Sequence, residues 1–192
     1  MEDCVLTDGK VWLSRPTEAD IDSIVEACQE PSIGAWTTVP VPYGRADAEY
    51  FLTEIVAPGW ARDSPTWALR PAEDGPVRGM IGFGPSRPAD PTAAEIGFWL
   101  SPALRGRGAM TRALLLACAY AFRPEGPALQ RIEWRAFVGN HASAAVARRA
   151  GFHYEGTLRL GALHQGTRRD SWIAARLATD PPTPAEDWPP GI

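Results

Sequence analysis

The chain has 192 residues, of which 45% are hydrophobic and 22% charged, a composition that predicts one globular domain with a full core and excludes wholesale disorder. The longest unbroken apolar stretch, residues 113–122, is about half the roughly 20 residues that a membrane-spanning helix needs. The net charge of −4 argues against a protein whose main role is to coat nucleic acid, because such proteins neutralise phosphates with basic residues.

The first predicted elements are a short strand and a helix. Residues 11–13 are apolar and predict the strand. Thr17 and Asp20 form a capping box, which predicts the start of a helix whose apolar residues recur with helical spacing as far as Cys28. The prediction ends this helix at Pro31, because proline lacks the N–H group that a helix interior needs.

A second helix is predicted over residues 48–55, from apolar residues at the same spacing, and it stops at Pro58. The segment between the two helices, residues 36–43, contains two prolines. Prolines forbid a helix and stiffen the chain, so this segment is predicted to be a rigid loop. Its large aromatic residues are Trp36 and Tyr43.

Apolar runs bounded by turn residues predict six further strands, over 66–69, 77–83, 94–100, 131–137, 152–158 and 170–177. A helix is predicted over 110–122, after a Gly-rich loop, and another begins at Asn140 and ends at Gly151. In residues 131–137 charged residues alternate with apolar ones, as in a half-buried strand. The element order, β-α-α-β-β-β-α-β-α-β-β, predicts an α/β fold with a mixed sheet flanked by helices.

Only the end of the chain departs from this pattern. Residues 179–192 are rich in proline and show no periodicity, which predicts an extended tail behind a single domain over residues 1–178. Trp188 lies inside the tail, and we expect it to dock either on the body of the protein or on a partner.

Several common sites are absent from the sequence. It contains no HExxH motif and no close cluster of His and Cys, so no metal site is predicted. It also lacks a G-x-S-x-G motif and a nucleotide-binding P-loop. The three cysteines form no CxxC pair, and the chain opens without a basic region followed by an apolar run. These features predict a reducing, cytoplasmic location.

The loop at residues 104–111 lies between a predicted strand and a predicted helix. Its glycines let backbone N–H groups approach an anion, and the helix N-terminus adds its dipole and unpaired N–H groups. Arg105 and Arg107 add positive charge. The loop therefore predicts a pyrophosphate cradle. The alternative is a plain strand-to-helix turn in a chain rich in Arg and Gly.

A second motif begins at Asn140, which is the only asparagine of the chain and follows directly on a predicted strand. Asn140 suits the N-cap of the next helix, and Ser143 stands where a capping partner would stand. Gly151 and Phe152 follow the helix. Capping alone accounts for these residues, but their place after a strand also suits a binding site.

Together the two motifs resemble those of a known superfamily. The sequence Arg105-x-x-Gly108-x-Met110, after the strand that contains Glu95, resembles the R/Q-x-x-G-x-G/A acyl-CoA signature of the GNAT N-acyltransferases. Asn140-x-x-Ser143, followed by Gly-Phe, resembles the next block. The resemblance covers about residues 10–178 and is closest to the Rim-type branch, the ribosomal-protein-alanine N-acetyltransferases. Met110 departs from the signature, and its side chain either crowds the cradle or points into the core.

The resemblance implies a mixed, mostly antiparallel sheet of about seven strands with a splayed central pair and about four helices. Acetyl-CoA, or another acyl-CoA, would lie in the gap between the strands and need no metal. The backbone of Phe98, Trp99 and Leu100 would pair with the pantetheine amides, and Asn140 would bond the pantetheine arm. The loop residues that would hold the pyrophosphate are Arg105, Gly106, Arg107, Gly108, Ala109, Met110 and Thr111.

The implied reaction is transfer of an acetyl or other acyl group to a primary amine, of a protein N-terminus or a small molecule, by direct attack. For the general base we favour Glu95, acting through water; the alternative is a glutamate on the solvated side of a strand. Rim-type relatives use a glutamate before the last strand, where residues 160–164 have no carboxylate. His164 and Asp170 are the substitutes.

For the proton donor we favour Ser143, with simple helix capping as the alternative. Many members of the superfamily use a tyrosine seven residues after the asparagine, but that position is Ala147. Tyr154 and His153 are weaker candidates.

Trp36 and Tyr43 are expected either to wall the acceptor cleft or to anchor their loop in the core. An acidic protein with carboxylates near the gap suits a cationic amine, and no nucleic acid or membrane partner is expected. Trp60, Trp67 and Trp188 are more large aromatics than a small core needs, which favours a homodimer. The competing function is a non-catalytic acyl-CoA-binding sensor or interaction module.

Overall fold

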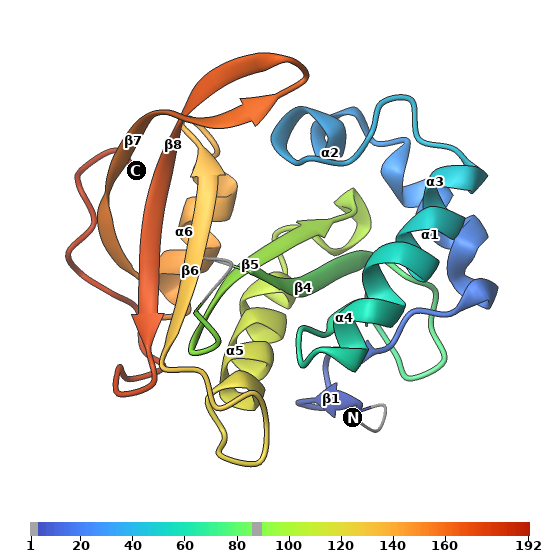
Figure 1. Cartoon of the computed structure of the whole chain (residues 1–192), viewed down its shortest axis with the longest axis horizontal. Helices are drawn as coiled ribbons and strands as arrows, with labels where there is room; N and C mark the ends of the chain where they lie inside the picture. The colour runs from blue at the N-terminus through green and yellow to red at the C-terminus, as the bar shows by residue number, and fades with distance from the viewer. Residues whose placement is uncertain (1–3, 86–89) are drawn as a thin grey trace.

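The computed structural model describes residues 4–85 and 90–192, and its centre is one eight-stranded sheet in the order β1-β2-β3-β4-β5-β6-β8-β7 (Figure 1). The strands are β1 (Leu6–Thr7), β2 (Trp12–Ser14), β3 (Thr66–Arg70), β4 (Gly79–Pro85), β5 (Ala93–Leu100), β6 (Arg131–Phe137), β7 (His153–His164) and β8 (Thr167–Leu177). Every neighbouring pair is antiparallel except β5 and β6, which are parallel. The expected mixed, mostly antiparallel sheet is confirmed, and β1, with only two residues, is the strand that the sequence pattern missed.

Helices flank both the N-terminal half of the sheet and its centre. They are η1 (Glu18–Asp20), α1 (Ile21–Cys28), α2 (Pro31–Trp36), α3 (Arg45–Tyr50), the π-helical η2 (Phe51–Val56), α4 (Ala57–Ala61), η3 (Pro102–Leu104), α5 (Ala109–Ala121) and α6 (His141–Arg149). Figure 1 shows α1, α3 and α4 grouped beside β4, and α6 beside β6. No helix in the described ranges is long and apolar enough to cross a bilayer.

The two prolines that were predicted to end helices have different surroundings. The second predicted helix does not stop at Pro58 but continues without a break from α3 through η2 into α4, which ends at Ala61. Helix α1 ends at Cys28, and Pro31 begins α2. The first turn of α2 requires no N–H donor, so it accepts Pro31. Trp36 is therefore the last residue of a helix rather than the first residue of a rigid loop.

The last hairpin is longer than predicted at both strands. β7 continues to His164 and β8 begins at Thr167, so the two strands are joined by a two-residue turn whose residues both have positive φ. A bulge in β7 interrupts the pairing, and the N–H of Leu160 in this bulge donates to Oδ1 of Asp170 at 2.7 Å. The bulge hides the alternation that would have extended the predicted strand.

The tryptophans on which the expectation of a homodimer rested are buried in the core. Trp60, Trp67 and Trp188 are 2%, 0% and 6% exposed, so they provide no exposed apolar face. The proline-rich end carries no helix or strand, but it packs against the body. The indole N–H of Trp188 donates to the Phe152 carbonyl at 2.7 Å. Of the two alternatives for Trp188, docking on the body is the one observed.

Candidate active site at a splayed strand pair

β5 and β6 separate partway along their length. They pair from Ala93 opposite Arg131 to Ile96 opposite Trp134, and beyond that point β5 pairs with β4 alone and β6 with β8 alone. Figure 1 shows the two strands diverging from a common start. The edge of β5 over residues 98–100 therefore turns backbone groups that have no partner on β6 toward the gap. An extended ligand could pair with these groups as a further strand would.

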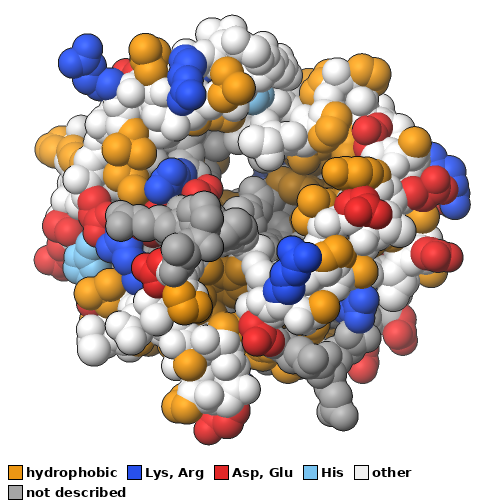
Figure 2. All heavy atoms as spheres, viewed as in Figure 1, with side chains coloured by type: hydrophobic (Ala, Val, Ile, Leu, Met, Phe, Trp, Pro, Cys, Tyr) orange, Lys and Arg blue, Asp and Glu red, His pale blue; other side chains and the backbone are white. Residues whose placement is uncertain are grey.

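A cleft of about 1700 Å³ opens at this separation. Its walls come from strands β3 to β8, from α2 and η2, from the loop before α5, and from α5 and α6 themselves. Figure 2 shows the molecule hollowed near its centre. The volume exceeds the roughly 300–1,000 Å³ of most small-molecule pockets. The cleft is therefore large enough for a long ligand and a second reactant.

The loop before α5 has the backbone geometry of an anion site. Gly106 and Gly108 both have φ of +72°, and Gly108 is the N-cap of the 13-residue α5. The first helical bond runs from the N–H of Arg112 to the carbonyl of Gly108, so the N–H groups of residues 109–111 have no partner within the helix. Met110 is only 3% exposed and belongs to the core. Its side chain does not crowd the loop.

The two loop arginines differ in their contacts. Arg105 donates from Nε to the Leu100 carbonyl at 3.0 Å and from Nη2 to Ser32 Oγ at 2.9 Å, so it ties the loop to β5 and α2. Arg107 is exposed and has no hydrogen bond or ion pair with any residue in the described ranges. Arg107 is thus the cation of this loop that is available to a ligand.

Asn140 and Ser143 both line the cleft and both hold the start of α6. Oδ1 of Asn140 accepts from the Ser143 N–H at 3.2 Å, which is the predicted N-cap. Ser143 Oγ in turn accepts from the Trp134 indole at 3.0 Å. These contacts leave the amide N–H groups of Asn140 and the hydroxyl proton of Ser143 without partners in the described part of the chain. Capping therefore does not prevent either side chain from contacting a ligand.

Strand alternation places Glu95 and Ser143 on opposite sides of the gap. Glu95 is the register partner of Glu133, so both carboxylates lie on one face of the sheet. The next pair, Ile96 and Trp134, lies on the other face, and it is Trp134 that contacts Ser143. A group held in the gap would have a carboxylate on one side and a hydroxyl on the other.

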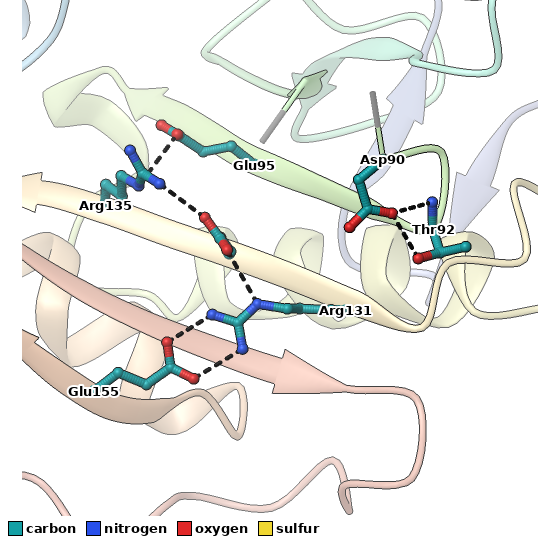
Figure 3. A network of polar contacts seen from close by, with 7 residues as sticks. Asp90, Thr92, Glu95, Arg131, Arg135 and Glu155 are labelled. Atoms are coloured by element: carbon teal, nitrogen blue, oxygen red, sulfur yellow. Dashed lines mark hydrogen bonds and ion pairs between the residues drawn. The ribbon is translucent and has the colours of Figure 1, made fainter. Parts of the chain in front are cut away.

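An ionic chain runs from the cleft across the sheet (Figure 3). Oε2 of Glu95 lies 3.5 Å from Nε of Arg135, and Nη2 of the same guanidinium donates to Oε2 of Glu133 at 2.9 Å. Glu133 accepts from Arg131 at 3.0 Å, and Arg131 is paired with Glu155 at 2.6 Å. The alternating charges of β6 predicted a half-buried strand, but Glu133 is only 1% exposed and two guanidiniums hold it. The charged face of β6 is therefore buried at Glu133, while Arg131 and Arg135 on either side of it stay partly exposed.

The two facing carboxyl groups differ in their pKa. Burial raises the pKa of Glu95, the Arg135 guanidinium opposes this, and the Glu133 carboxylate adds to it. Burial also acts to raise the pKa of Glu133, but the hydrogen bonds from Arg131 and Arg135 outweigh it and lower that pKa. Glu95 is therefore the better proton acceptor of the two, and it is the one that lines the cleft.

The substitute bases lie outside this cleft. His164 Nε2 is 2.9 Å from the Gly34 carbonyl, and its ring packs on Phe137 at 4.7 Å. Asp170 holds the β7 bulge through Leu160. Neither is among the residues that line this cleft, although their chain neighbours Leu163 and Ser171 are.

Of the aromatic and histidine side chains that were also considered, Trp36 lines the cleft, whereas Tyr43, Tyr154 and His153 are not among its lining residues. Trp36 lines the cleft and is 36% exposed, beneath the guanidinium of Arg169. Tyr43 is 9% exposed and belongs to the core, which fits the alternative of a loop anchor. Tyr154 and His153 bond Thr157 and Asp187 and do not line the cleft.

Sequence reasoning missed several residues of the cleft wall. Arg135 was read as part of an exposed strand face, and Phe51 and Ile55 as the apolar stripe of an ordinary helix. The signal for Arg135 was its position two residues after Glu133, on the same face of β6. Among the residues that the structure describes, no three His, Cys, Asp or Glu side chains group as a metal site would require.

Comparisons with known proteins agree with this geometry. The family model described as Acetyltransferase (GNAT) domain matches residues 10–153. YdaF of Bacillus subtilis (strain 168), classed by its name among ribosomal N-acetyltransferases, is 37% identical over 165 residues, 83% of this chain and 86% of the relative. Among solved structures, RimL, a ribosomal L7/L12 alpha-N-protein acetyltransferase, has a TM-score of 0.79 at 19% identity over 91% of this chain and 94% of its own. The microcin C7 self-immunity acetyltransferase MccE, solved with acetyl-CoA and AMP, has a TM-score of 0.77 at 19% identity over 90% of this chain and 98% of its own.

Proposed function

Because the chain belongs to the GNAT acetyltransferase family, in its Rim-like branch, and is an acetyl-CoA-dependent N-acetyltransferase, we propose that its acceptor is the α-amino group of a protein N-terminus. The observation that carries the proposal is the gap between β5 and β6, with Glu95 on one side and the anion loop and Ser143 on the other. The names of the relatives YdaF and RimL support a protein acceptor.

The cofactor end of the cleft suits acetyl-CoA. Unpaired N–H groups at the start of α5 and the exposed Arg107 would receive the pyrophosphate. The open edge of β5 at residues 98–100 would pair with the pantetheine amides, and the free amide N–H groups of Asn140 would donate to the same arm. The thioester would then lie where the strands begin to separate.

The proposed reaction is direct attack of the amine on the thioester carbonyl. Glu95 accepts a proton from the amine through water, and the nitrogen then forms the new C–N bond. Unpaired N–H groups on the β5 edge stabilise the oxyanion of the tetrahedral intermediate. As the C–S bond breaks, Ser143 donates its hydroxyl proton to the departing sulfur and takes up in return the second proton of the attacking nitrogen, so the products are a neutral amide and the CoA thiol. The raised pKa of Glu95 favours its part in this sequence.

Thiol release from acetyl-CoA with a mixed panel of amines tests the proposal. The panel contains short peptides with free N-termini, the same peptides with blocked N-termini, and small primary amines. We expect release with the free peptides and none with the blocked ones. Release with small amines alone would reject the protein acceptor. A non-catalytic sensor would bind acetyl-CoA and release no thiol with any amine.

Asn140 and Ser143 are predicted to have separable roles. Asn140→Ala is expected to weaken acetyl-CoA binding, because it removes the free amide N–H groups from the cleft. Ser143→Ala is expected mainly to lower kcat, because the proton donor is lost while the cofactor contacts stay. Calorimetry and steady-state kinetics measure the two effects. If Asn140→Ala loses only the ~1 kcal/mol of stability of a helix cap and both variants keep normal kinetics, neither side chain takes part in the reaction.

A further inference from the structure

Two glycines lie beside Glu95 on its face of the sheet, on the side away from Glu133 and Arg135. Gly84 is the register partner of Glu95 on β4, and Gly97 lies two residues further along β5 on the same face. A Cβ atom added at either glycine would meet no atom of the described residues within 4 Å. Neither glycine has a positive φ, so backbone conformation does not explain the choice of glycine. A glycine inside a strand often marks the close approach of a ligand.

This glycine floor offers apolar contact rather than hydrogen bonds. The β4 and β5 backbones pair with each other through Gly82 opposite Gly97 and Gly84 opposite Glu95, so their ladder groups are used. A Cβ at Gly82 would collide with the Thr66 side chain, so that glycine is required by packing. Gly84 and Gly97 are not, and their Cα–H groups form the surface of the cleft at this point.

Two apolar side chains of the neighbouring helical segment also line this cleft. Phe51 and Ile55 line it from η2, the π-helical segment that precedes α4. Ile55 is 49% exposed, so its side chain is available for contact with a ligand. Single-turn π segments occur frequently at functional sites. Here the segment lies between two α-helices and supplies both apolar side chains.

We propose that the glycine floor (Gly84 and Gly97) and the wall (Phe51 and Ile55) form a slot for a bulky apolar side chain on the N-terminal residue of the acceptor. This proposal rests on the proposed function, because the occupant of the slot is inferred from the role of Glu95 as the base for the acceptor amine. An amine that reaches Glu95 places the substituent of its α-carbon over the adjacent glycines. Bare backbone leaves room for that substituent, and the apolar wall favours Leu, Ile or Met over Gly or a charged residue.

The test compares peptides that differ only in their first residue, Gly, Ala or Leu. We expect wild-type kcat/KM to be at least about tenfold higher for the Leu peptide than for the Gly peptide. Gly97→Val fills the slot, so it is expected to lower kcat/KM for the Leu peptide at least about tenfold and to change the value for the Gly peptide less than about threefold. The acetyl-CoA dissociation constant should stay unchanged.

A second variant keeps the test decisive if Gly97→Val does not fold. Ile55→Ser removes the apolar wall and is expected to reduce the preference for Leu over Gly. Tyr50→Ser is the matched control, because Tyr50 lies on the same helical run, is 63% exposed and does not line the cleft. Its preference should equal that of the wild type.

The outcomes separate this slot from the function on which it rests. Acetylation of all three peptides at equal rates, or equal slowing of the Leu and Gly peptides by Gly97→Val, overturns the slot and leaves the proposed function standing. Failure of the wild-type enzyme to acetylate any free N-terminus overturns the proposed function and the slot together.

Discussion

Replacing Glu95 by Gln is expected to lower kcat about 100-fold or more and to leave the dissociation constant of acetyl-CoA unchanged. Gln keeps the size and hydrogen-bonding capacity of the side chain but cannot accept the amine proton. The carboxyl group lines the cleft beside the separation of β5 and β6, whereas His164 and Asp170 lie outside the cleft. Steady-state kinetics with the best peptide of the panel, and calorimetry with acetyl-CoA, measure the two quantities.

Glu155→Gln is the matched control for this experiment. Glu155 is a carboxylate at the outer end of the same ionic chain, and it does not line the cleft (Figure 3). Its replacement should leave kcat within about threefold of the wild-type value, because an exposed ion pair contributes little. Near-normal turnover of Glu95→Gln at neutral pH would show that Glu95 is not the base.

The pH dependence of kcat follows from the raised pKa of Glu95. The base acts only when it is deprotonated, so kcat should fall as pH decreases through this pKa, at a higher pH than an ordinary glutamate would give. Burial is the main cause of the shift and the Arg135 guanidinium opposes it. Arg135→Gln should therefore move the acid limb of the profile to higher pH. Movement to lower pH would contradict this assignment. The deficit of Glu95→Gln should shrink at high pH, where more of the amine is already free.

Gly108→Asp is expected to weaken acetyl-CoA binding at least about tenfold, or about 1.4 kcal/mol. Gly108 is the N-cap of α5, with φ of +72°, and a side chain there would meet no atom of the described residues within 4 Å. A carboxylate at this position would project beside the unpaired N–H groups and repel a pyrophosphate. Calorimetry measures the affinity, and the melting temperature checks the fold.

Gly108→Asn separates charge from backbone strain. Asn and Asp tolerate a positive φ to a similar degree and are equally good N-caps, and they differ by the charge alone. We expect Asn to bind acetyl-CoA more tightly than Asp does. Equal affinities of the two variants would mean that the loop does not face the phosphates, and an unchanged affinity of folded Gly108→Asp would remove the cradle altogether.

The sequence by itself determined the features that depend on a few neighbouring residues. Asn140 and Ser143 formed the predicted cap, because an N-cap bond spans only three residues. The Gly-rich loop before α5 was located because glycines next to a helix start are a local signal. Strand β6 was predicted at its observed bounds from alternation alone. The family followed from the order and spacing of these same motifs.

Only the tertiary structure decided features that depend on partners far along the chain. Glu133 looked like a solvated charge until β8 and two guanidiniums enclosed it. The hydrogen bonds of His164 with the Gly34 carbonyl and of Asp170 with the Leu160 N–H depend on the β7–β8 hairpin and its bulge. The sequence did not predict that glycines lie beside Glu95, because only the strand register places Gly84 opposite it. A capping or turn residue acts on backbone within one or two turns, whereas register and burial are set by which strands pair, and that depends on the whole chain.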